Sequence, residues 1–185
     1  MLSPFILTLQ YQLCLIDGLD ASMNVYPDLL TRIPLDYSGQ VYRSPMPFSR
    51  FDPSQQVWSE YVAHGICDVF VLAESFELPR VFGVELLDFY QFHGLNAYHY
   101  PIPDFQIPAD RKTLEVAIET LDSRARAGKN IAVHCLAGMG RTGLFLACFA
   151  KRHLDCGGLE AIRWIRSVIP GALENLLQEN FVLDF

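Results

Sequence analysis

The chain has 185 residues, of which 51% are hydrophobic and 12% aromatic, and its formal net charge is −7. This length and composition can bury the core of one globular domain, and we expect a single domain over residues 1–185. The negative charge argues against general nucleic-acid binding, which needs a basic surface. The five cysteines show no framework spacing, which argues against a disulfide scaffold and favours a reducing compartment, the cytoplasm.

Residues 1–52 are predicted to form an N-terminal strand followed by an irregular segment. Apolar side chains alternate over residues 5–15, and this period of two is typical of a half-buried strand. The first sixteen residues contain no Lys or Arg, which speaks against a signal peptide, and no apolar run is long enough to span a membrane. Residues 21–51 are rich in turn formers. Arg43 and Arg50 are candidate contacts for an acidic substrate face, although arginines in such a segment are more often simply solvated.

Residues 53–185 are predicted to alternate between helices and strands as the core of the protein. Helices are expected at 53–63, 79–93, 110–127, 144–154, 159–168 and 174–183, and strands at 66–72, 97–100 and 130–134. This order predicts an α/β fold with a mostly parallel central sheet and helices on both of its faces. Open sheets of this kind bind ligands at the carboxyl ends of their strands.

The most informative stretch is residues 134–143, HCLAGMGRTG, which follow an apolar strand. A cysteine six residues before an arginine, in a glycine-containing loop, can hold a phosphate dianion over a sulfur nucleophile. Backbone N–H groups of residues 136–141 can curl around an anion, and the helix that follows would point its positive end at the same place. Both features favour the thiolate form of Cys135, which is the form that attacks phosphorus.

The other residues of this stretch have separate expected roles. The planar guanidinium of Arg141 matches two phosphate oxygens, which a lysine would not do. Thr142 is placed to hydrogen-bond the sulfur and make it a better leaving group, and His134 is expected to orient the loop rather than act as a base. The predicted phosphate-binding residues are Leu136, Ala137, Gly138, Met139, Gly140 and Arg141, in which the glycines permit positive φ angles.

Thiolate attack also needs a neutral acid that protonates the leaving oxygen. Asp104, in the sequence YPIPDF, follows a predicted strand on a loop that prolines stiffen, so it can close over the substrate. Asp110 is the competing acid, although its position favours the N-cap of the next helix. Gln178, near the C-terminus, is the candidate for holding the water that hydrolyses the covalent intermediate.

Together these motifs resemble the cysteine-based protein tyrosine phosphatase superfamily, and within it the dual-specificity branch that includes the kinase-associated phosphatases. The resemblance covers roughly residues 65–185 and rests on four segments: 134–143, 101–104, 65–72 and 170–181. It implies a tyrosine phosphatase-like fold and a phosphocysteine at Cys135. It further implies phosphate binding by Arg141, acid and then base catalysis by Asp104, and orientation of water by Gln178.

The expected function is therefore a phosphoprotein phosphatase that acts on phosphotyrosine and on phosphoserine or phosphothreonine. No Cys/His spacing suggests a metal site, and no cofactor is expected. The expected partners are a phosphorylated protein substrate and a kinase-containing complex. Two alternatives stay open: a phosphatase of phosphoinositides or small metabolites, which the uncharged loop disfavours, and a non-catalytic phosphate-binding module. A sulfurtransferase or arsenate reductase would not need the acid at Asp104.

Overall fold

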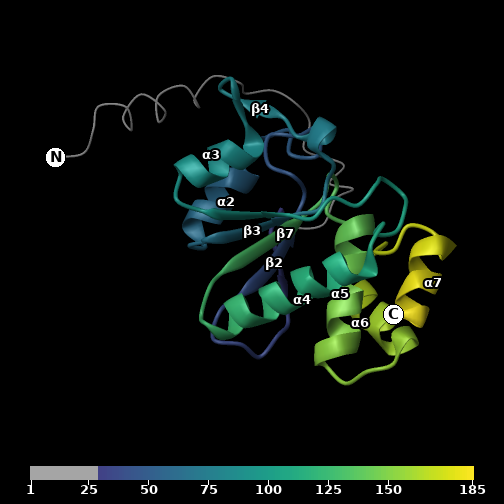
Figure 1. The fold of residues 1–185 in the computed structure, drawn as a ribbon. Coiled ribbons are helices and arrows are strands. Elements are labelled where there is room, and N and C mark those ends of the chain that lie inside the picture. The colour runs from purple at the N-terminus through teal and green to yellow at the C-terminus, as the bar shows by residue number, and fades with distance from the viewer. Residues whose placement is uncertain (1–28) are drawn as a thin grey trace, which may run out of the picture.

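A five-stranded sheet lies at the centre of the computed structural model, which describes residues 29–185 (Figure 1). Its strands are β1 (Thr31–Ile33), β2 (Val41–Ser44), β3 (Asp68–Val71), β6 (Asn96–His99) and β7 (Ile131–His134). They lie in the order β1-β2-β7-β3-β6, and every neighbouring pair is parallel except β1 with β2. The prediction of a mostly parallel central sheet is confirmed.

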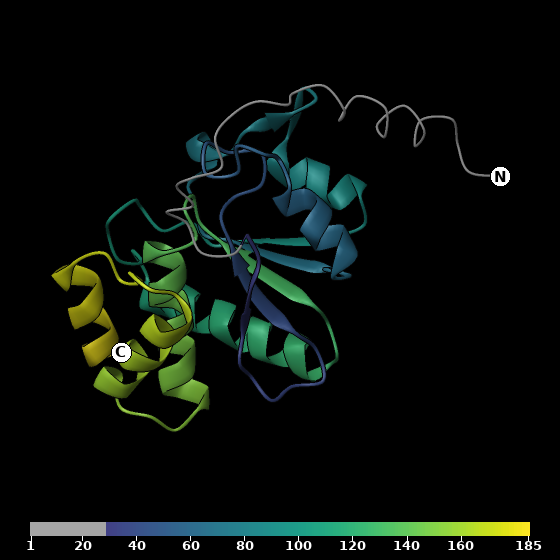
Figure 2. The same ribbon diagram turned by 180° about the vertical axis from the view of Figure 1, so that it is seen from behind.

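Helices cover both faces of this sheet, as predicted (Figures 1 and 2). One side carries α2 (Val57–Ala63) and α3 (Leu86–Phe92); the other carries α4 (Arg111–Arg126), α5 (Gly140–His153), α6 (Gly158–Val168) and α7 (Leu176–Asp184). Successive strand side chains point to opposite faces. In β3, Val69 therefore packs with the α2 and α3 side, whereas Phe70 packs with the α4 and α5 side.

The segment predicted to be irregular contains two strands of the sheet. β2 lies between β1 and β7, and Val41–Ser44 pairs with Ile131–His134. The prediction that Arg43 contacts a substrate face is wrong, because its side chain is 1% exposed within the sheet. A charged residue in a four-residue strand hides the apolar pattern that identifies a buried strand. The strand predicted over residues 5–15 lies outside the described residues.

Several predicted helix boundaries shift in the structure. Residues 79–93 are not one helix, because β4 (Arg80–Val81) and β5 (Val84–Glu85) form a hairpin before α3 begins. Phe82 and Gly83 both have positive φ, as a two-residue hairpin turn requires. α2 starts four residues later than predicted, where the carboxylate of Asp52 accepts the N–H groups that open the helix.

α5 shifts in the other direction and begins at Gly140, inside the loop that follows β7. The predicted start of α4 is confirmed, since Asp110 accepts the N–H groups of Lys112 and Thr113 as its N-cap. Within residues 29–185, none of the helices has the length and apolar character that crossing a bilayer requires.

Candidate active site

Cys135 lies in the tight loop between β7 and α5, and its side chain is buried. The backbone N–H of Gly138 donates to its sulfur at 3.3 Å. Gly138 has φ +75°, and a Cβ there would overlap the carbonyl of Ser44. The loop thus closes against the end of β2, where Met46 N–H also donates to the carbonyl of Leu136 at 3.0 Å. Only glycine fits this approach, because it lacks a Cβ.

Arg141, in the first turn of α5, is 2% exposed and paired with Glu77. Its two terminal nitrogens donate to the two carboxylate oxygens of Glu77 at 2.5 and 2.9 Å, and one of them also reaches the carbonyl of Ile102 at 3.2 Å. Burial raises the pKa of Glu77, but the hydrogen bonds from Arg141 and from the backbone of Glu74 outweigh burial and leave that pKa lowered. Glu77 therefore fixes the guanidinium as a charged, oriented fork.

Glu77 is a functional residue that the sequence reasoning missed. It belongs to η1 (Ser75–Glu77), a single helical turn that follows β3. An acidic residue in such a turn is ordinarily solvated and has no local signature of a role. Its only distinguishing feature in the sequence is its place after a strand of the parallel sheet, where the binding edge lies.

Asp104 meets two of the other predicted catalytic residues, Cys135 and Arg141, at this edge. It follows β6, and its carboxylate lies 3.0 Å from Arg141 Nη2. A pocket of about 80 Å³ brings together its side chain with those of Cys135 and Arg141. The residues around it are Arg50, Phe51, Asp104, Phe105, Cys135, Leu136, Ala137, Gly140, Arg141 and Glu174. Of the predicted loop residues, Leu136, Ala137 and Gly140 thus line the pocket, and Gly138 and Met139 complete the loop.

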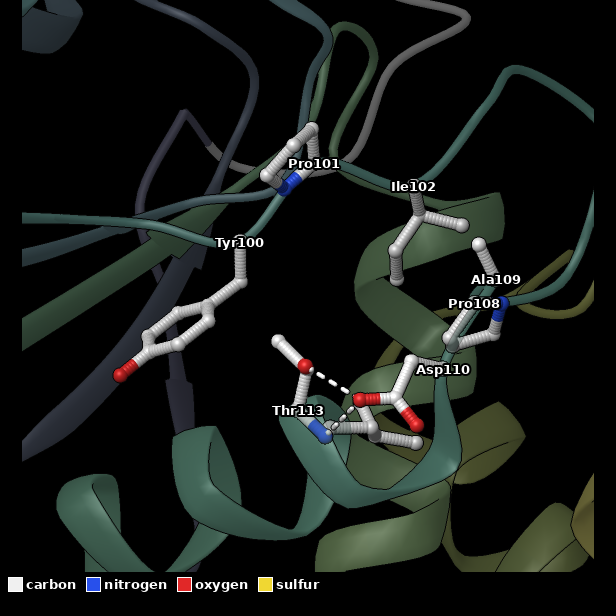
Figure 3. Close-up of a pocket in the computed structure, with 8 residues that line it drawn as sticks. Tyr100, Pro101, Ile102, Pro108, Ala109, Asp110 and Thr113 are labelled. Atoms are coloured by element: carbon white, nitrogen blue, oxygen red, sulfur yellow. Dashed lines mark hydrogen bonds between the residues drawn. The ribbon is translucent and has the colours of Figure 1, made fainter.

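Asp110, the competing acid, lies away from this pocket. It lines a separate cavity of about 180 Å³, where its carboxylate accepts hydrogen bonds from the hydroxyl and the backbone N–H of Thr113 (Figure 3). These bonds, and that from the backbone of Lys112, lower the pKa of Asp110. A group held in its carboxylate form by a helix terminus is a poor proton donor. The geometry therefore favours Asp104.

His134 is buried at the end of β7 and holds the start of the loop. Its Nδ1 lies 2.9 Å from the carbonyl of Cys135 and its Nε2 lies 3.0 Å from the hydroxyl of Tyr90. Since a carbonyl only accepts, Nδ1 carries the proton and Nε2 accepts from Tyr90. Burial lowers the pKa of His134 to about 4. A neutral imidazole with both nitrogens engaged orients the loop, as the sequence predicts, and is not free to act as a base.

Thr142 does not make the predicted hydrogen bond to the sulfur. Its hydroxyl is buried and has no hydrogen-bond partner among residues 29–185, and the sulfur instead accepts the N–H of Gly138. The short loop sets the direction of each side chain at the helix start. Sequence spacing alone does not fix that direction.

Gln178 is buried, but its amide is engaged away from the pocket. Its side-chain oxygen accepts the N–H of Glu174 at 2.9 Å, and its nitrogen donates to the carbonyl of Gln106 at 3.3 Å. The residue that enters the pocket from this segment is Glu174, whose carboxylate packs against Gly140. Burial and the nearby Asp104 raise the pKa of Glu174. The sequence reasoning chose the glutamine because Glu174 reaches the pocket only through tertiary folding.

Among residues 29–185, no three His, Cys, Asp or Glu side chains are grouped so that they could hold a metal ion. Four groups of the site can take part in chemistry: the buried Cys135, whose sulfur accepts a backbone N–H, the guanidinium of Arg141, the Asp104 carboxylate on its loop, and the Glu174 carboxylate. The cysteine and the arginine suit an anion with tetrahedrally arranged oxygens, and the loop carboxylate can serve as a proton donor on the far side of that anion.

Comparisons with known proteins identify the family of the chain. The family model "Tc-R-P: Polymorphic toxin system, DSP-PTPase phosphatase" matches residues 49–155. Cyclin-dependent kinase inhibitor 3 of Rattus norvegicus is 30% identical over 135 residues, which cover 71% of this chain and 62% of the relative. Dual specificity protein phosphatase CDC14B of Mus musculus is 32% identical over 90 residues, covering 49% of this chain and 18% of the relative. The chain thus spans less than two thirds of the length of these relatives.

Solved structures show the same fold. Tk-PTP in its active form is 30% identical with a TM-score of 0.67, and the match covers 83% of this chain and 94% of that one. Kinase associated phosphatase, with its catalytic cysteine replaced by serine, is 25% identical with a TM-score of 0.74, covering 86% and 94%. The chain therefore belongs to the DSP-PTPase family, in the dual-specificity branch of the cysteine-based protein tyrosine phosphatases.

Proposed function

We propose that this chain hydrolyses phosphomonoesters on proteins, through a phosphocysteine intermediate. The observation that carries the proposal is the convergence of Cys135 and Arg141, from the loop after β7, with Asp104, from the loop after β6, in one small pocket. Pure phosphate binding needs neither a sulfur nucleophile nor an acid, so this combination favours catalysis over a binding module.

The geometry supports a two-step reaction. In the first step the Cys135 thiolate forms a bond to phosphorus, the bond to the leaving oxygen breaks, and Asp104 gives its proton to that oxygen. Arg141 and the loop N–H groups bind the phosphate oxygens throughout. In the second step water attacks phosphorus, its proton passes to the Asp104 carboxylate, and the sulfur leaves as a thiolate. Glu77 keeps Arg141 in place when the phosphate replaces Asp104 beside it.

The residues at the mouth of the pocket favour protein substrates whose phosphate is esterified to an aromatic ring. Phe51 and Phe105 both line it, and Phe105 is 54% exposed. Two aromatic side chains beside a phosphate site offer stacking surfaces for a phenyl ring. Arg50 also lines the mouth, with its guanidinium 4.9 Å from the centre of the Phe51 ring. We therefore propose phosphotyrosine as the preferred substrate, with phosphothreonine and phosphoserine also accepted, and acidic residues near the phosphate favoured by Arg50.

A substrate panel tests this function. Wild type and Cys135→Ser are assayed against phosphotyrosine and phosphothreonine peptides and against inositol phosphates. We expect turnover of the peptides, loss of all turnover in Cys135→Ser, and a phosphorylated cysteine in rapidly quenched wild type. Faster turnover of inositol phosphates than of peptides would indicate a metabolite phosphatase. Full activity in Cys135→Ser would exclude the phosphocysteine route.

Replacement of the acid tests the second assigned role. Asp104→Ala should lower kcat most for substrates with a basic leaving group and least for nitrophenyl phosphate, whose leaving group needs little protonation. Equal losses on every leaving group would place the acid elsewhere.

We also propose a cytoplasmic location and a kinase-containing complex as partner. A thiolate nucleophile survives in a reducing compartment, and the four cysteines among the described residues are free thiols. Similarity to proteins named cyclin-dependent kinase inhibitor 3 supports the partner. Calorimetric titration of a purified cyclin-dependent kinase into Cys135→Ser should give saturable binding, and the absence of heat at micromolar concentration would contradict it.

A further inference from the structure

The loop that carries Asp104 is packed at its base, where Ile102 is 2% exposed, but not at its tip. The stems on either side of its tip line the 180 Å³ cavity, one through residues 100–102 and the other through residues 108–110 (Figure 3). At the tip, the side chains of Asp104 and Phe105 are about half exposed. Phe105 also has φ +56°, a conformation that residues with a Cβ adopt at a free-energy cost. The N–H of Gln106 donates to the carbonyl of Pro103 at 3.0 Å and closes this turn, and contacts from outside the loop add to the bonds that keep the tip in place.

Two of these contacts come from the start of α7. The side-chain nitrogen of Asn175 donates to the carbonyl of Phe105 at 2.8 Å. The side-chain nitrogen of Gln178, one turn later, donates to the carbonyl of Gln106 at 3.3 Å. These bonds join consecutive carbonyls of the tip to residues 70 and 72 positions away in the chain. The start of α7 thus holds the loop directly beside the acid.

The side-chain amide of Asn175 also makes a second contact, which caps α7. Its side-chain oxygen accepts the backbone N–H of Gln178 at 3.0 Å and so caps α7. Serine and aspartate can cap a helix in the same way. An aspartate has no donor for the Phe105 carbonyl, and a serine would have to make both bonds from one oxygen on a shorter side chain, whereas the amide uses its oxygen for the cap and its nitrogen for the carbonyl.

The anchor itself is firmly attached to the core. Val182 of α7 is fully buried among residues of α5 and α6. Arg166 of α6 donates to the carboxylate of Glu179 in α7 at 2.6 Å. Because α5 also carries Arg141, the acid loop and the phosphate site are both held by the same layer of helices.

We propose that Asn175, assisted by Gln178, is a positioning residue that holds the acid loop closed over the phosphate pocket. This inference rests on the proposed function, since it concerns delivery of the Asp104 proton. Loss of the bond to Phe105 allows the tip to leave its strained conformation, which lowers the fraction of molecules with the acid in reach. The step that needs the acid slows, whereas phosphate binding by Arg141 is unaffected.

Three substitutions at Asn175 separate the two tasks of the amide. Asn175→Asp and Asn175→Ser both retain a cap acceptor and remove the amide donor, and Ser does so without adding charge. Asn175→Ala removes both bonds. Leu176→Ala, at a 72% exposed position of the same helix, is the matched control. Each variant is assayed with phenyl phosphate, which has a basic leaving group, and with p-nitrophenyl phosphate, which has an acidic one.

Loss of one neutral hydrogen bond should lower kcat on phenyl phosphate by about two- to tenfold in the Asp and Ser variants. The kcat on p-nitrophenyl phosphate, the KM values and the urea midpoint should stay close to wild type, and Leu176→Ala should match wild type throughout. Asn175→Ala should lose stability as well. Unchanged kcat on phenyl phosphate in both Asp and Ser variants, or equal losses on the two substrates, overturns the positioning role.

Hydrogen exchange gives a readout that does not depend on turnover. Backbone amides of residues 104–107 should exchange faster in Asn175→Ser than in wild type, while those of α5 keep their protection. Equal exchange in the two proteins would show that Asn175 does not hold the tip. If wild type cleaves neither aryl phosphate, the proposed function fails, and the exchange measurement still decides whether the loop is held.

Discussion

Acidification should destabilise the fold through one buried histidine. His134 has an ordinary pKa of 6.5 that burial lowers to about 4 in the folded chain. Because the folded pKa is below the unfolded one, the unfolded chain binds more protons between these values. The contribution of His134 to the free energy of unfolding is therefore fully present above about pH 6.5 and is lost as the pH falls toward 4.

The size of this loss follows from the two pKa values. With 6.5 in the unfolded chain and about 4 in the folded chain, lowering the pH from about 8 to about 5 costs about 2 kcal/mol, and complete titration costs about 3 kcal/mol. A loss of this size is a large part of the total stability of a typical domain.

Urea unfolding at the two pH values measures the effect, with His134→Gln as the control. The carboxylates and the other four histidines titrate in both proteins, so they cancel in the comparison. Wild type should lose about 2 kcal/mol more than the variant. The imidazole of His134 should also show no NMR titration above about pH 5. A midpoint near 6.5 would refute the neutral, buried histidine regardless of how the variant folds.

Three further substitutions test the site. Glu77→Gln breaks the buried pair with Arg141 and should cost about 3 kcal/mol in urea unfolding and raise KM for aryl phosphates; an unchanged KM would show that Arg141 needs no anchor. Glu174→Gln removes a negative charge from the phosphate pocket and should lower KM about fivefold, whereas a higher KM would assign the carboxylate a binding role. Gly138→Ala should cost about 2–4 kcal/mol through strain and overlap with Ser44, against about 1 kcal/mol for Gly94→Ala, where φ is positive and no heavy atom lies within 4 Å. Equal losses for the two glycines would contradict the close approach of the loop to β2.

Local patterns were sufficient for much of the fold. The alternation of helices and strands after residue 65 predicts the parallel sheet, and Asp110 marks the start of α4 by capping two N–H groups within three residues. The predictions failed where the local signal was weak or ambiguous. The four residues of β2 include a buried arginine, and the hairpin before α3 consists of two-residue strands that a helical pattern overlaps.

The residues of the site divide in the same way, into those that a local pattern identifies and those that it does not. Cys135 and Arg141 could be predicted as site residues because a phosphate loop is built from consecutive residues, and the spacing between them is therefore visible in the sequence. Asp104 could be placed because it follows a strand of the same sheet. Glu77 contacts Arg141 across 64 positions and Asn175 contacts Phe105 across 70. Neither pairing leaves a pattern in the chain.

By itself, the sequence determined the type of sheet and predicted the residues proposed as nucleophile, phosphate-binding arginine and acid. Only the tertiary structure decided which carboxylate anchors Arg141, that Glu174 rather than Gln178 enters the pocket, and what holds the acid loop. The physical reason is the range of the interactions. Backbone curvature and helix capping act within a few residues, whereas the register of β2, β3, β6 and β7 and the docking of α7 bring distant side chains to one edge of the sheet.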